Sequence, residues 1–76
     1  PLRIATAEVF ESWIDGLTAY LMLGGEIERD RSRELAIEII AILEGAFVLS
    51  RALKSPEPMH VAGTNAVARV QAALLG

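Results

Sequence analysis

The chain has 76 residues, a net charge of −3, no cysteine and a single histidine, which excludes disulfides and both thiolate and histidine-rich metal sites. It has no basic stripe that could neutralise phosphates, so these residues are not expected to bind nucleic acid. A domain this small buries only about 60% of the surface that its unfolded chain exposes. Because 53% of the residues are hydrophobic, we expect a partner to cover part of the apolar surface.

The segment Ala5–Leu23 has the spacing of an amphipathic helix, with large apolar side chains three and four residues apart and acidic side chains opposite. Gly24 and Gly25 are expected to end this helix, since glycine takes the left-handed conformation that closes a C-terminus. An aromatic stripe with polar tips on Trp13 and Tyr20 suits a small-molecule pocket, although such stripes are more often ordinary core. This candidate ligand wall consists of Phe10, Trp13, Leu17 and Tyr20.

A second helix is expected to begin near Asp30 or Ser32, either of which could cap it, and to run to about Leu53. The charged entry, residues 26–34, is expected to be solvated. The rest is apolar on most sides, which predicts burial on most sides and a further chain covering part of it.

Pro56 stops the second helix and, with Ser55 as the cap, starts a third that runs from about Glu57 to Leu74. No segment has the alternation of a strand. The fold class predicted from these patterns is therefore all-α, with three helices.

Small side chains follow one narrow arc of the second helix at Ala41, Gly45 and Ala52. A glycine in mid-helix suggests that another helix packs closely there, either the third helix or a symmetry mate. Glu44 lies among apolar residues, so it is expected either to pair with Arg51 across a two-fold axis or to be solvated at a rim.

Nothing in the sequence indicates catalysis. His60 has no nucleophile or orienting group in a recognisable pattern, and Glu38 and Glu44 project about 120° apart around one helix. The longest apolar stretch, Ile39–Ser50, contains Glu44 and is shorter than the roughly 20 residues of a membrane span. We therefore expect a non-enzymatic cytoplasmic protein without a cofactor or a metal.

Several of these features occur in a recognisable order: an aromatic-rich helix that ends at a glycine pair, a long apolar helix carrying Leu43-Glu44-Gly45-Ala46, and a proline break before a last helix. This order resembles the last three helices of TetR-family transcriptional regulators over roughly Phe10–Leu75. Ser50 stands where that pattern leads us to expect alanine.

The resemblance implies a homodimer in which the last two helices of each subunit form a four-helix bundle across a two-fold axis. The second and third helices would then supply the interface, and Phe10, Trp13, Leu17 and Tyr20 would form one wall of a pocket for a small lipophilic effector. The expected interface residues are Ile42, Gly45, Ala46, Leu49, Leu53, His60, Gly63, Val67, Val70 and Leu74.

The resemblance also implies that residues 1–76 are a C-terminal dimerisation and effector-binding region, and that the DNA-binding helix-turn-helix domain is absent from them. The alternative is a stand-alone helical module that assembles with itself or with another protein.

Overall fold

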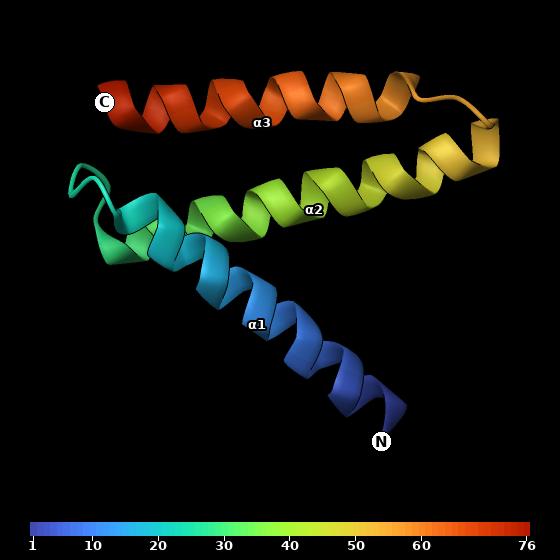
Figure 1. Cartoon of the computed structure of the whole chain (residues 1–76), viewed down its shortest axis with the longest axis horizontal. Helices are drawn as coiled ribbons and strands as arrows, with labels where there is room; N and C mark the ends of the chain where they lie inside the picture. The colour runs from blue at the N-terminus through green and yellow to red at the C-terminus, as the bar shows by residue number, and fades with distance from the viewer. The chain divides into compact units, whose positions relative to one another are not determined.

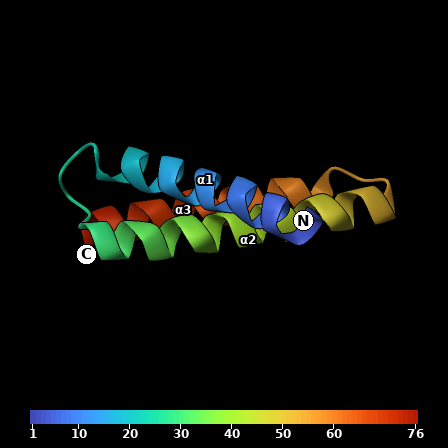
Figure 2. The same ribbon diagram turned by 90° about the horizontal axis from the view of Figure 1, so that it is seen from below.

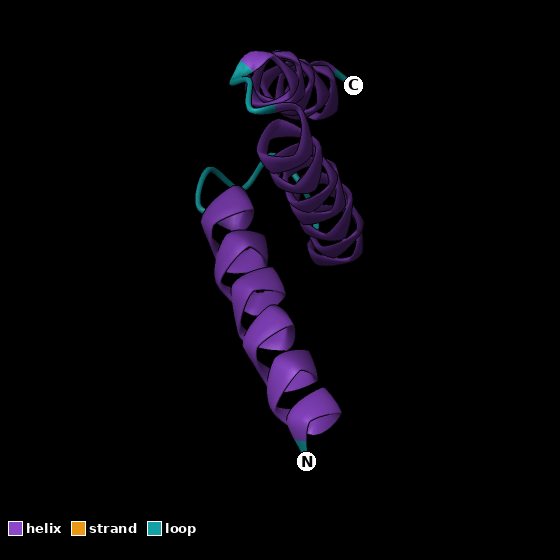
Figure 3. Cartoon of the chain, turned by 90° about the vertical axis from the view of Figure 1, so that its right-hand side faces the viewer, coloured by secondary structure: helices purple, strands orange, loops and turns teal.

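The computed structural model describes residues 1–76 and contains three α-helices and no strand (Figures 1 and 3). They are α1 (Leu2–Met22), α2 (Arg29–Leu53) and α3 (Glu57–Leu75). The predicted all-α class and the number of helices are confirmed, and α1 begins at Leu2 rather than Ala5. The chain divides into two compact units, Pro1–Ile37 and Glu38–Gly76.

The end of α1 is closed by glycine, as predicted. Gly25 has a φ of 73°, in the left-handed region, and its N–H donates to the carbonyl oxygen of Met22 over 2.9 Å. A residue with a Cβ is disfavoured in this conformation. The conformation of the turn between α1 and α2 therefore depends on Gly25, which the sequence analysis had already assigned to the end of this helix.

The start of α2 differs from the prediction. Neither Asp30 nor Ser32 caps it, because the helix begins at Arg29 and both residues lie inside it. The carboxylate of Glu28 accepts the N–H of Arg31 over 3.3 Å, which is the bond a capping side chain makes. The Ser32 hydroxyl instead donates to the carbonyl oxygen of Ile27 over 3.3 Å.

Residues 26–34 are not uniformly solvated, which corrects a second expectation. Ile27 is only 5% exposed and Ser32 is fully buried. The hydroxyl of Ser32 is satisfied by the Ile27 carbonyl, so its burial leaves no unpaired donor. These two residues join Thr18, Leu35 and Ala36 as the buried side chains of the first unit.

The α2–α3 turn is closed by a residue other than glycine. Lys54 has a φ of 52°, and the N–H of Ser55 reaches back to the carbonyl oxygen of Ser50 over 3.1 Å, the long bond of a helix-terminating motif. The Ser55 hydroxyl then accepts the N–H of Glu57 over 3.2 Å. Ser55 thus satisfies a first-turn donor of α3 as predicted, although Pro56 occupies the N-cap position.

In the second unit, the C-terminal part of α2 and the whole of α3 run side by side in opposite directions (Figures 1 and 2). An ion pair between Glu38 and Arg69 joins them. The buried side chains here are Ile39, Ala46 and Ala62. Two of these three are alanines, so the helices approach closely but bury little apolar area.

Candidate functional site

In the second unit an open groove with a volume of about 480 Å³ lies between α2 and α3. Its floor is alanine, and its walls carry aliphatic side chains together with one amide and one carboxylate. The lining residues are Ala41, Ile42, Gly45, Ala46, Leu49, Glu57, Pro58, Val61, Ala62 and Asn65.

The interface residues predicted on α2 gather in this groove. Ile42, Gly45, Ala46 and Leu49 all line it, whereas Leu53 lies outside it and is 64% exposed. Of the small-residue arc, Ala41 and Gly45 also line the groove, whereas Ala52 does not. That these residues form an interface between copies stays a prediction.

The residues predicted on α3 do not line the groove. Val67 and Val70 border a separate hollow of about 310 Å³ with Ile39, and His60 borders a third. Gly63 is half-buried and Leu74 is 46% exposed. The structure thus places the predicted α2 and α3 sets around different hollows.

The α3 residues that do face the α2 set were not singled out from the sequence. They include Pro58, Val61 and Asn65, which recur at spacings of three and four and so project from one side of α3. Their spacing is a usable signal, but α3 carries a second apolar stripe with the same period. Spacing alone does not decide which stripe meets α2.

No contact within the chain requires a glycine at position 45 of the groove. A Cβ built at Gly45 would meet no atom within 4 Å, so α3 does not require a glycine there. The sequence left two candidates for a helix packed closely against Gly45: the third helix of the same chain or a symmetry mate. The third helix is not that close neighbour.

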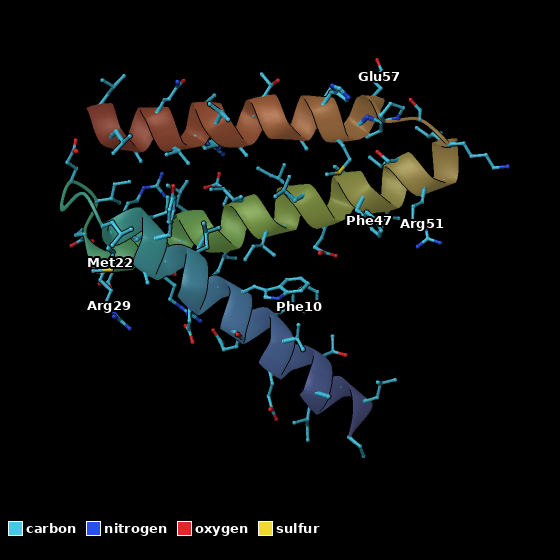
Figure 4. The ribbon with its side chains drawn as sticks, in the orientation of Figure 1. Phe10, Met22, Arg29, Phe47, Arg51 and Glu57 are labelled. Carbon is cyan, nitrogen blue, oxygen red and sulfur yellow. The ribbon has the colours of Figure 1, made fainter.

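A different side of α2 carries Phe47 and Arg51, which Figure 4 shows pointing away from α3. The Arg51 guanidinium lies 5.6 Å from the centroid of the Phe47 ring, within cation–π distance. Glu44 is exposed. Arg51 therefore has an aromatic partner on its own helix, and its expected pairing with Glu44 of a symmetry mate is not needed to place it.

The aromatic candidates lie in the first unit. The Phe10 and Trp13 rings meet edge to face, with centroids 5.1 Å apart and planes at 85°, a favourable aromatic geometry. Trp13 is 49% exposed and Tyr20 is 70% exposed, while Phe10 and Leu17 are half-buried.

An open hollow of about 510 Å³ lies beside Trp13 on α1. Of the four predicted wall residues, only Trp13 lines it. The other lining residues, which the sequence reading did not identify, are Ala5, Glu8, Val9 and Ser12.

One arginine ties α1 to the start of α2. Arg33 donates to Glu11 over 2.8 Å and to Asp15 over 3.3 Å, so these two carboxylates face α2 rather than the side opposite the packing face. The hydrogen bond and charge of Glu11, with a smaller contribution from Asp15, raise the pKa of Arg33. The three side chains are between 42% and 67% exposed, so these two ion pairs add little to the stability of the unit.

The structure was also searched for groups of metal-binding side chains and for membrane-spanning helices. No three histidine or acidic side chains are grouped so that they could hold a metal ion. None of the three helices combines the length and the apolar character needed to cross a membrane.

Comparison with known proteins identifies relatives. Residues 1–65 match a family described as "Transcriptional regulator LmrA/YxaF-like, C-terminal domain". The chain is 36% identical over 61 residues to the HTH-type transcriptional regulators MT0206 and Rv0196 of Mycobacterium tuberculosis, from strains CDC 1551 / Oshkosh and ATCC 25618 / H37Rv. Each match covers 80% of this chain but 31% of the relative, so the chain spans about a third of their length. No solved structure matches the chain.

Proposed function

The chain belongs to the LmrA/YxaF-like C-terminal domains of TetR-family transcriptional regulators, and from this premise we propose that it is the dimerisation and effector-sensing region of a repressor. Its partner is a second copy, and α2 and α3 of the two copies form a four-helix bundle. Operator binding resides in a helix-turn-helix domain outside residues 1–76. Residues 1–76 carry no enzymatic activity.

The observation that carries the pairing is the apolar surface left open on the second unit. Large aliphatic side chains of both helices remain about half exposed or more, and the unit buries only Ile39, Ala46 and Ala62. Open apolar surface on this scale marks an association site. The side chains concerned are Val48, Leu49, Leu53, Val61, Val67 and Leu74.

Sedimentation equilibrium of the isolated chain tests the pairing. We expect a mass of twice 8.2 kDa at micromolar concentration, because an exposed apolar bundle face is stable only when it is covered. A single species of 8.2 kDa across the accessible concentrations would contradict the proposal.

The effector part of the proposal rests on the first unit. Trp13 offers a half-exposed indole, edge-stacked on Phe10, at the border of an open hollow lined largely by apolar atoms. Such a surface suits one wall of a site for a small lipophilic compound, with Leu17 and Tyr20 extending it along α1.

Trp13 is the only tryptophan of residues 1–76, so the difference in emission between the wild type and Trp13→Phe reports on this wall. In the protein that contains the whole pocket, we expect lipophilic compounds to shift the emission of Trp13 as they displace water from the indole. Trp13→Phe provides the control, since it should remove the part of the shift that comes from Trp13 while keeping an aromatic ring. The absence of any shift across a chemically diverse panel would make Trp13 an ordinary packing residue.

The alternative is a free-standing helical module that only assembles with itself or another protein. The open apolar faces suit both candidates. The coding sequence upstream of Pro1 separates them, because a basic helix-turn-helix pattern there would support the repressor and a start codon next to Pro1 would support the module.

A further inference from the structure

We infer that the hollow beside Trp13 binds a small organic cation with an aromatic or aliphatic body, and that Glu8 meets its charge while Trp13 covers its face. The inference rests on the effector wall of the proposed function and adds the chemical class of the effector. The hollow has a volume of about 510 Å³, and every residue that lines it belongs to α1. Its geometry is therefore that of a single helix.

The hollow has a floor of small side chains between one charged and one aromatic side chain. Ala5 and Ser12 lie seven residues apart, so they project from nearly the same side of α1. Glu8 and Trp13 lie on either side of this floor, about 140° apart on a helix of 3.6 residues per turn. A ligand seated on the floor thus meets a carboxylate at one edge and an indole at the other.

Glu8 is the one carboxylate of α1 that has no cationic partner in the chain. The other two, Glu11 and Asp15, both accept hydrogen bonds from Arg33. Arg3 is the only basic residue of α1, and it forms no ion pair and does not line the hollow. The negative charge at the hollow is therefore not compensated within the chain.

Trp13 gives the hollow a second feature that attracts cations. Its side chain is 49% exposed, and an indole attracts a cation above its face more strongly than the ring of tyrosine or phenylalanine does. Phe10 packs edge to face against it at 5.1 Å and supports its orientation. The charge of Glu8 and the ring of Trp13 thus favour the same kind of ligand.

Other occupants fit the hollow less well. A metal ion requires several oxygen ligands, whereas Glu8 is the only carboxylate that lines the hollow. An anion would be repelled by Glu8. A neutral lipophilic compound would remove water from the carboxylate without giving it a partner, which costs free energy. A cation with an apolar body avoids each of these difficulties.

Tetraphenylphosphonium and triphenylphosphine oxide test the inference as a pair of probes, because both carry phenyl rings on phosphorus but only the first is charged. In the protein that contains the whole pocket, we expect calorimetric titration to show tighter binding of the cation. Added salt should weaken binding of the cation alone. Glu8→Gln should weaken binding of the cation about two- to fivefold, as expected for the loss of one partly exposed charge pair, and leave binding of the neutral probe unchanged.

Glu44→Gln is the matched control. Glu44 is also exposed and forms no ion pair, but it lies on α2, so the substitution should leave the affinity for both probes unchanged. Equal weakening of cation binding by the two substitutions would overturn the inference, because it would reflect a general attraction to a chain of net charge −3.

The emission of Trp13 separates failure of the inference from failure of the proposed function. If the neutral probe binds as tightly as the cation or more tightly, or if the cation does not bind, the inference is wrong. The effector wall then stands as long as some lipophilic compound changes the emission of the wild type and not that of Trp13→Phe. If no compound of either kind does so, both the inference and the effector wall fail.

Discussion

At the scale of single residues, Gly45 is the position that most clearly indicates packing of another chain against α2. A glycine in mid-helix destabilises the helix by about 1 kcal/mol relative to alanine. Apart from its own stretch of helix, nothing in the chain lies within 4 Å of the position that the Cβ of residue 45 would occupy. The penalty therefore has no compensation within one copy. A second copy packed against α2 would compensate it.

Gly45→Leu tests this reading. We expect the substitution to hold the paired helices apart, lower the equilibrium mass towards that of one chain and lower the thermal midpoint. Gly16→Leu is the matched control, because a Cβ at Gly16 also meets nothing within 4 Å but lies on α1. The control should gain about 0.5 to 1 kcal/mol from helix propensity, or several degrees in the midpoint for a chain of this size.

An unchanged mass and midpoint for Gly45→Leu would contradict close packing at this position. A gain equal to that of Gly16→Leu would go further, since it would show that α2 is free at Gly45 in solution as well.

At the scale of elements, the helices themselves could be predicted from periodicity, and two of their boundaries from Gly25 and Pro56. The start of α2 could not. Its position depends on Ile27 being buried and on Ser32 bonding to the Ile27 carbonyl, which are tertiary contacts. Local sequence preferences predict Ser32 as a helix cap, because they do not include the tertiary contacts around the turn.

The side of α1 that is buried could not be predicted from hydrophobicity either. Thr18 is 6% exposed and its hydroxyl donates to the Ile14 carbonyl over 2.6 Å, so a polar residue fills a core position at no loss. Trp13, which an apolar-stripe reading would bury, is half exposed. Hydrophobicity marks the aromatic residues as a group but does not rank them by burial.

On α3 the sequence does not determine which of two apolar stripes lies beside the groove with α2. The inward positions are small, Ala62 and Ala66, while Val61 and Val67 remain more than half exposed on different sides. A sequence pattern predicts that two stripes exist. Only coordinates show that Val61 borders the groove with Gly45 and that Val67 does not.

At the scale of the whole molecule, the two units suggest a division of labour. The first holds the exposed indole and the Arg33 ion pairs, and the second holds the groove between α2 and α3. An effector on α1 and a partner on α2 and α3 would thus occupy different parts of a chain that spans about a third of its relatives.

The intact mass of the polypeptide that the natural gene produces tests this account most directly. It can be measured by mass spectrometry of the protein captured from its source cells with an antibody against α3. The account predicts a mass of about 2.6 times 8.2 kDa, because the 61 aligned residues make up 31% of each relative. A mass of 8.2 kDa would contradict it, because the chain would then act without a DNA-binding domain of its own.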